Sequence, residues 1–137
     1  MSRRYYEWSM LVLRISLGVI FLAHGLQKIS GFEGILKFFA SIGLPATLAY
    51  VVATIETVGG ACLILGLFTR SAAVGIIMIM VGAIFSVKLS KGFIGGYELD
   101  VSLLAIAVSL VLSGSNTLSL GNLFRSLLGA SSKNKAT

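Results

Sequence analysis

Charged residues are scarce in this sequence. Only 12% of its 137 residues are charged, about half the share of a typical soluble domain, whereas 56% are hydrophobic. A water-soluble domain of this length cannot bury so much apolar surface, because much of any small fold faces the solvent. A bilayer offers an apolar solvent to an outward-facing apolar surface. The composition therefore predicts an integral membrane protein.

Cysteine and histidine are also scarce, with one residue of each, Cys62 and His24. A lone cysteine forms no internal disulfide, and no C-x-x-C motif is present, which excludes dithiol chemistry by this chain alone. A lone histidine excludes an internal bis-histidine haem, and no cluster has metal-ligand spacing, so we expect no metal site. Dinucleotide and phosphate-loop motifs are absent as well. No cofactor is evident, and a redox role would need a diffusible carrier such as a quinone, or a partner subunit.

Basic residues outnumber acidic ones, giving a net charge of +6. The eleven Lys and Arg residues lie scattered at the ends of apolar segments, and no nucleic-acid motif accompanies them. Cations at such positions are typical of residues that face lipid headgroups. We therefore expect the lipid bilayer as a partner, and no nucleic acid.

Four apolar segments are long enough to cross a bilayer, since about 20 residues of helix span a hydrocarbon core of about 30 Å. They predict an all-α fold, a four-transmembrane-helix bundle within residues 1–121. Thr69–Ser71 is predicted to be a tight turn, and Lys91–Tyr97 a glycine-rich loop. The predicted spans are Trp8–Lys28, Ala46–Phe68, Ala72–Leu89 and Glu98–Leu112.

Two further segments are too short or too polar to span. Residues 30–45 carry apolar residues at helical spacing and predict a short interfacial helix between the first two spans, which Gly43 and Pro45 would end. Residues 122–137 predict a short amphipathic segment followed by a flexible cytoplasmic tail.

Four spans place both termini on one side of the membrane. That side would hold six cations, Arg3, Arg4, Arg70, Arg125, Lys133 and Lys135, against four on the other, Lys28, Lys37, Lys88 and Lys91. This bias favours cytoplasmic termini.

Glu56 is the ionisable residue nearest the middle of a span. A charged group there costs about 2.5–3.5 kcal/mol and usually faces the interior of the bundle, with a partner. Gly59 and Gly60 follow one turn later on the same face, and they would admit a close neighbouring helix. The face that carries Glu56 is therefore predicted to be an interior packing face.

The first span offers partners for Glu56 on a single stripe about 120° wide. Counted from the outer end, His24 lies about 7 Å deep, Glu56 about 15 Å and Arg14 about 22 Å. The stripe consists of Arg14, Leu17, Gly18, Phe21, His24, Gly25 and Lys28.

Two interpretations of these groups stay open. Glu56 with Arg14 or Lys28 would form a buried ion pair that only fixes helix register. Alternatively, His24, Glu56 and one cation would build a ligand or proton site.

The other ionisable residues lie near span ends. Lys88 and Arg70 are expected to extend toward the interface. Glu98 and Asp100, in the first turn of the last span, complement the helix dipole. Glu98 also offers a partner to Lys88 or Lys28, and such pairing would close the outer end of the cavity that the ligand site at His24 and Glu56 would occupy. The candidate ligand-binding residues are thus Arg14, Lys28, Arg70, Lys88 and Glu98, with His24 and Glu56 as catalytic candidates.

Several motifs in order resemble the DoxX family of membrane proteins. The resemblance covers roughly residues 9–121, in the runs LRISLGVIFLAHGLQKI, SIGLP, AYVVATIETVGGACLILGLFTR, AIFSVKLSKGF and GYELD. It implies a bacterial inner-membrane protein linked to quinone-dependent sulfur or oxygen chemistry, because founding members are subunits of a thiosulfate:quinone oxidoreductase. The positions that carry over are His24, Gly25 and Lys28 of an H-G-x-x-K pattern, with Pro45, Glu56, Arg70 and Glu98. Many relatives have histidine where this chain has Lys88.

The stripes and the resemblance together suggest a membrane subunit in quinone-linked redox or in detoxification of phenols under oxidative stress. His24 and Lys28 would hydrogen-bond a quinone or phenol oxygen, and Glu56 would exchange a proton. The alternative is a non-catalytic anchor or assembly partner for a soluble oxidoreductase. Besides the bilayer, the expected partner is such an oxidoreductase or a further copy of the chain in a homo-oligomer. A small proton-coupled transporter is a third hypothesis, which no inverted repeat or broken helix supports.

Overall fold

The computed structural model describes residues 2–114 and 118–134, with side chains up to residue 131. Over these residues the chain is helical and has no β-strand. Four helices are long and apolar enough to cross a membrane: Arg3–Ser30, Ala46–Leu65, Thr69–Lys91 and Phe93–Ser113. The predicted all-α fold with four spanning helices is confirmed.

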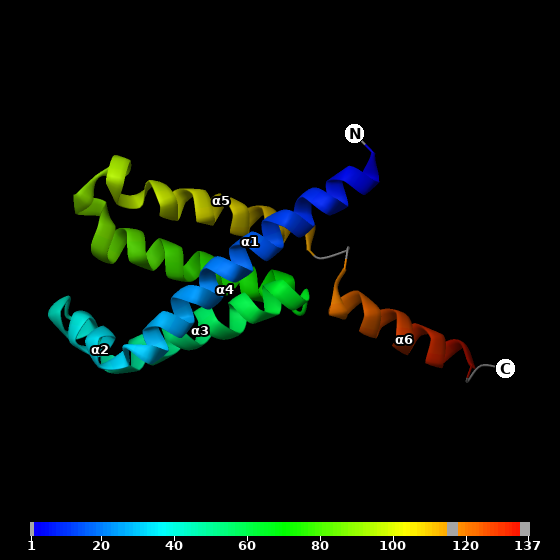
Figure 1. Cartoon of the computed structure of the whole chain (residues 1–137), viewed down its shortest axis with the longest axis horizontal. Coiled ribbons are helices and arrows are strands. Elements are labelled where there is room, and N and C mark those ends of the chain that lie inside the picture. The colour runs from blue at the N-terminus through cyan, green and yellow to red at the C-terminus, as the bar shows by residue number, and fades with distance from the viewer. Residues whose placement is uncertain (1, 115–117, 135–137) are drawn as a thin grey trace.

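The helices pack as two pairs (Figure 1). α1 lies along α3, and α4 lies along α5, while α3–α4 and α1–α5 contacts join the pairs. We call the end where α1 begins and α3 turns into α4 the Arg70 end, and the opposite end the Lys28 end. The helices are α1 (Arg3–Ser30), α2 (Phe32–Ser41), α3 (Ala46–Leu65), α4 (Thr69–Ala83), α5 (Glu98–Ser113) and α6 (Leu120–Asn134).

Glycines set the distance between α1 and α3. A Cβ added at Gly60 would lie 2.5 Å from the backbone nitrogen of Leu22, and one at Gly18 would lie 2.9 Å from the Gly60 carbonyl oxygen. A Cβ at Gly25 would collide with Thr57. Close backbone contact between helices is what small residues permit in membranes. This glycine seam confirms the close approach expected at Gly60.

The core lies where all four long helices meet. Its members recur at three- and four-residue spacing along α1, α4 and α5, as a buried helical face requires, and α3 adds Leu63. Its members are Leu17, Phe21, Leu63, Ala73, Ile76, Met80, Leu103, Ala107 and Leu110.

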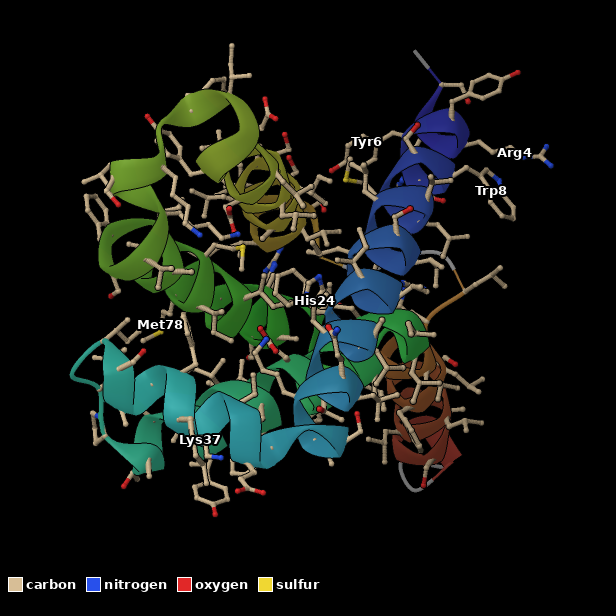
Figure 2. The ribbon with its side chains drawn as sticks, turned by 60° about the vertical axis from the view of Figure 1, so that its left-hand side comes forward. Arg4, Tyr6, Trp8, His24, Lys37 and Met78 are labelled. Atoms are coloured by element: carbon tan, nitrogen blue, oxygen red, sulfur yellow. The ribbon has the colours of Figure 1, made fainter. Side chains whose placement is uncertain are left out.

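The outward face of the bundle is also apolar. Val19 on α1, Val58 on α3 and Met78 on α4 are more than half exposed. Hydrocarbon is the solvent that such a face matches. Trp8 and Tyr6 lie in the first turns of α1, where an interfacial aromatic belt is expected (Figure 2).

The turn between α3 and α4 differs from the prediction. α3 ends at Leu65 because Gly66 adopts the left-handed conformation (φ 71°), and Phe68 is left-handed too (φ 47°). α4 therefore begins at Thr69, and the predicted tight turn at Thr69–Ser71 is wrong: those residues form the first turn of a helix. The sequence signal for the true turn is Gly66.

The connection from α4 to α5 is irregular helix. A widened π-type segment, η1 (Ile84–Lys88), passes into a 3₁₀ turn, η2 (Leu89–Lys91), and then η3 (Phe93–Tyr97). Ile94 and Gly95 break the helical path inside η3. Short helical turns therefore form most of the predicted glycine-rich loop, and they place Lys88 and the start of α5 at the Lys28 end.

Two shorter helices flank the bundle. α2 connects α1 to α3 in the chain, and Lys37 points away from the surface of α2 (Figure 2). The position of α2 at a membrane interface stays a prediction. α6 begins at Leu120, includes the predicted amphipathic segment and runs to Asn134. It extends away from the bundle (Figure 1). Residues 135–137 of the expected flexible tail lie outside the described residues.

Candidate functional site

Lys28 and Glu56 form an ion pair between α1 and α3. Lys28 Nζ donates to Glu56 Oε2 at 2.7 Å. The Glu56 side chain is 5% exposed, and the Lys28 side chain is 20% exposed. The carboxylate is therefore held inside the bundle, while the lysine reaches it from the edge. Of the two cations considered as partners of Glu56, the structure brings Lys28 to it.

The glycine seam creates this pair. Gly25 lies directly against Thr57, so the backbones of α1 and α3 touch at that level. Lys28 follows Gly25 by one helical turn on the same face, and Glu56 precedes Thr57. With α1 and α3 antiparallel, a long lysine side chain at this position spans the remaining distance to the carboxylate. Small residues in one helix thus determine which cation neutralises the acid in the other.

His24 lies on α1, one turn before Lys28 (Figure 2). It is exposed, and its ring packs at 6.3 Å, centroid to centroid, from the buried ring of Phe21. The prediction that His24 faces the interior is wrong, because the stripe is wider than the surface that α3 covers. His24 therefore lies at the open edge of the stripe, one helical turn from Lys28.

Arg14 belongs to a different part of the molecule. It is 2% exposed, and its Nη2 donates to the Leu118 carbonyl oxygen at 2.8 Å. Arg14 therefore ties α1 to the segment that leads into α6, at the Arg70 end. It lies about 21 Å along α1 from Lys28, at 1.5 Å per residue. The structure does not bring Arg14 to the Lys28–Glu56 pair.

A second buried ion pair lies in the other helix pair. Lys88 Nζ, at the end of η1, donates to both carboxylate oxygens of Asp100, at 2.8 Å and 3.0 Å. The Asp100 side chain is 5% exposed and that of Lys88 34%. Extension of Lys88 toward the interface was predicted, and instead the lysine turns inward to an acid. Each helix pair thus carries one buried carboxylate neutralised by a lysine.

Glu98 does not join these pairs. Its Oε1 accepts from the Gly95 backbone N–H at 3.0 Å, and the residue is exposed. The prediction that Glu98 pairs with Lys88 or Lys28 is wrong, because the break at Gly95 offers the carboxylate a nearer donor. Glu98 stabilises the start of α5 and closes no cavity with the lysines.

Arg70 is exposed in the first turn of α4, as expected for a residue at a span end. Its Nη2 donates weakly to the Leu112 carbonyl oxygen, at 3.5 Å. Its side chain lies next to Gly114, where an added Cβ would be 3.3 Å from Nε. Arg70 therefore lies at the end of the bundle opposite to Lys28, and the structure does not bring it to the Lys28–Glu56 pair.

Asp100 is the residue that sequence reasoning missed as a site member. The sequence did contain a signal for it: Asp100 is in phase with Leu103, Ala107 and Leu110, all of which are buried. A carboxylate on the inward face of a span needs a cation. Glu98 is two residues earlier and lies on another face, so the two acids should have been separated.

The comparison with known sequences matches these motifs. The sequence profile of the DoxX family matches residues 9–89, more than half of the chain. The chain belongs to the DoxX family. The matched region contains the glycine seam and the Lys28–Glu56 pair, whereas Asp100 and α6 lie beyond it.

Curated relatives of this DoxX protein are membrane proteins or carry an oxidoreductase name. The chain is 45% identical over 115 residues to "Putative oxidoreductase CatD" of Bacillus subtilis, covering 84% of this chain and 86% of the relative. It is 37% identical to "Inner membrane protein YphA" of Escherichia coli, over 58% of this chain and 62% of the relative. It is also 37% identical to "Uncharacterized membrane protein Rv3486" of Mycobacterium tuberculosis, over 65% and 56%. No solved structure shows significant similarity to the chain.

Proposed function

We propose that this DoxX protein binds a quinone or a phenol at the Lys28–Glu56 pair and serves as a membrane subunit in quinone-linked redox or phenol detoxification. The observation that supports this proposal is a buried carboxylate with a lysine at the edge of the bundle and an exposed imidazole one turn away. The proposal places the protein in the bacterial inner membrane with cytoplasmic termini.

The three groups suit a ligand that presents a polar oxygen on an apolar ring. The Lys28 ammonium has three N–H donors, of which Glu56 takes one at 2.7 Å. His24 lies four residues before Lys28, so both side chains lie on one face of α1. An apolar ring is compatible with the surrounding hydrocarbon face, and its oxygen would accept from Lys28 and His24. An ion pair that only fixed the register of the two helices would bind no ligand oxygen.

A bound quinone supplies the two-electron chemistry, and the chain's own residues would hold the ligand and move protons. Lys28 and His24 would orient the oxygen, and Glu56 would pass a proton to or from Lys28 across their hydrogen bond. Electrons would come from a soluble oxidoreductase partner. The name of the Bacillus subtilis relative is consistent with such a role.

Binding in lipid nanodiscs tests the proposal. A short-chain naphthoquinone and catechol are titrated into the wild type and into His24→Ala, whose exposed position leaves folding intact. We expect a loss of affinity of about two- to tenfold, because one of two hydrogen bonds to the ligand is removed. Glu33→Gln is the matched control, since Glu33 is exposed on α2 and pairs with Lys37. Equal affinity of the wild type and His24→Ala would contradict the proposal.

A second candidate function is a non-catalytic anchor for a soluble oxidoreductase. The observation that favours it is the exposed apolar stripe of α6, made by Leu120, Leu123, Phe124, Leu127 and Leu128. A partner that co-purifies with the wild type, persists in Glu56→Gln and is lost in Leu127→Ser would favour the anchor. Retention of the partner in Leu127→Ser would exclude this surface.

The orientation is tested separately. The Arg70 end gathers Arg3, Arg4, Arg70 and Arg125, in keeping with a cytoplasmic position. A fluorescent protein fused after residue 137 should fold and fluoresce in the cytoplasm, whereas alkaline phosphatase fused there should stay inactive. Active phosphatase at this position would reverse the assignment.

A further inference from the structure

A pocket of about 630 Å³ opens at the Arg70 end, away from the Lys28–Glu56 pair. Among the described residues, three segments that are distant in sequence enclose it: the α3–α4 turn with the first turn of α4, the end of α5 with Gly114, and the first two turns of α6. Its lining consists of Gly66, Leu67, Phe68, Thr69, Arg70, Ser71, Ser113, Gly114, Gly121, Asn122, Phe124 and Arg125. The proposed quinone site does not use it.

The electrostatics of the pocket are one-sided. Among the described residues that line it, Arg70 and Arg125 are cationic and none is acidic. The two guanidinium groups come from α4 and α6, so tertiary structure brings together like charges that nothing in the local sequence pairs. Two positive side chains in one pocket repel each other unless an anion lies between them. The planar guanidinium of arginine can donate two parallel hydrogen bonds, and this geometry matches the oxygens of a phosphate group.

Neutral donors complete the pocket. Ser71, Ser113 and Asn122 add polar side chains to the lining. The N-terminus of α4 opens here, and its N-cap residue, Phe68, makes no side-chain cap. The backbone N–H groups of the first turn of α4 therefore face outward as donors, with the positive end of the helix dipole behind them. The Thr69 hydroxyl, on the same wall, is buried and has no hydrogen-bond partner in the described structure.

The pocket is held in shape from behind. Ser119 Oγ donates to the Gly66 carbonyl oxygen at 2.7 Å, and Arg14 holds Leu118. Gly66 admits Ser119 because a Cβ there would lie 2.8 Å from Ser119 Oγ. The first turn of α6 is therefore fixed against the α3–α4 turn, and this contact holds α6, which carries Arg125, at the pocket that Arg70 also lines.

Apolar rings flank the same pocket. Phe68 is 77% exposed and Phe124 57% exposed, and both line the pocket. The pocket lies at the end of four apolar helices, which is the level of the lipid headgroups when those helices span a bilayer. Basic pockets between helix ends are typical binding sites for anionic lipid headgroups.

We propose that the pocket enclosed by Arg70, Arg125 and the start of α4 binds a phosphate group, supplied by an anionic phospholipid whose acyl chains lie along Phe68 and Phe124. A free phosphate ion has the same charge chemistry and lacks the acyl chains, so the experiment separates the two sources.

The experiment compares the full-length protein in nanodiscs of phosphatidylcholine, with or without 20% phosphatidylglycerol, and in phosphatidylcholine with inorganic phosphate. Bound lipid is counted by native mass spectrometry, and thermal stability is recorded in parallel. The wild type should retain phosphatidylglycerol at least tenfold better than Arg70→Gln and Arg125→Gln. Arg125 lies on α6, outside the packed core, so the Arg125→Gln variant keeps the bundle folded.

Arg4→Gln is the matched control, because Arg4 is exposed at the same end and does not line the pocket. It should retain the lipid as the wild type does. An equal loss in Arg4→Gln would show general surface attraction and overturn the proposal. A stability increase from inorganic phosphate that equals the phosphatidylglycerol effect would identify a free-anion site and overturn the lipid assignment. Equal retention by all variants would overturn the pocket altogether.

Discussion

Lys28 Nζ lies 2.7 Å from Oε2 of Glu56, across a seam where Gly25 and Gly60 leave no space for a side chain. The contact and the seam depend on each other, since only a close pair of helices lets this lysine reach a carboxylate in the middle of α3. The stability of the α1–α3 pair should therefore respond to both.

The first prediction concerns the charge pair. Glu56→Gln or Lys28→Met alone should lower the free energy of unfolding by about 3 kcal/mol. Each variant removes one charge of the pair and leaves the opposite charge of the other residue uncompensated. The double variant should recover to within about 1 kcal/mol of the wild type. Unfolding in mixed micelles with increasing sodium dodecyl sulfate measures the cycle, and strictly additive losses would contradict the coupling.

The second prediction concerns the glycine seam. Gly60→Ala should destabilise the protein by about 1–3 kcal/mol, because its Cβ would collide with the Leu22 backbone, which cannot move aside easily. Gly82→Ala in α4 is the control, since nothing lies within 4 Å of the added Cβ. The control should be neutral or gain about 0.5–1 kcal/mol from higher helix propensity. If both variants unfold at the same detergent fraction, the seam does not set the packing.

The third prediction separates the two acids at the start of α5. Asp100→Asn should cost about 3 kcal/mol, because it removes the counter-charge of Lys88. Glu98→Gln should cost a few tenths of a kcal/mol, about the value of an exposed hydrogen bond whose acceptor the amide oxygen retains. The same unfolding assay compares them, and Lys88→Met added to Asp100→Asn should restore stability. Equal effects of the two substitutions would contradict the assignment of Asp100 as the buried partner.

The fourth prediction concerns the attachment of α6. Ser119→Ala removes the 2.7 Å bond to the Gly66 carbonyl, together with the weaker bond that the hydroxyl accepts from the Asn122 N–H, and should increase local opening at least about fivefold, the equivalent of about 1 kcal/mol. Amide hydrogen exchange at residues 120–124 measures this opening. Ser126→Ala is the control, because its hydroxyl bonds to Leu123 within α6 and holds no other element. Faster exchange in both variants would mean that α6 frays on its own.

Length and hydropathy were sufficient to predict the fold, because a helix that crosses hydrocarbon must satisfy its backbone internally and so has a readable length. The close approach at Gly60 was also predictable, since glycine on the face of a buried acid has few other uses in a membrane helix. The boundary at Thr69 was not, because the left-handed conformations of Gly66 and Phe68 moved the turn three residues earlier.

The site was only partly predictable from the sequence. Helical phase correctly placed Lys28 on the face toward Glu56, yet the same phase placed His24 inside, because a helical wheel does not show how much of a stripe one neighbouring helix covers. The partner of Arg14 lies 104 residues away, at Leu118, and no periodicity reports such a contact. Asp100 and Glu98 differ by two residues, and only the buried phase of α5 distinguishes them.

The hydrogen bonds that join residues 118–121 to Arg14 and Gly66 impose an order on biosynthesis. The ribosome adds these residues after all four spans, so the Arg70 end of the bundle cannot close while the last span is still being translated. Until Leu118 has been synthesised, the hydrogen bond from the Arg14 guanidinium to this carbonyl oxygen cannot form. This long-range contact of α1 therefore forms only after all four spans have been translated.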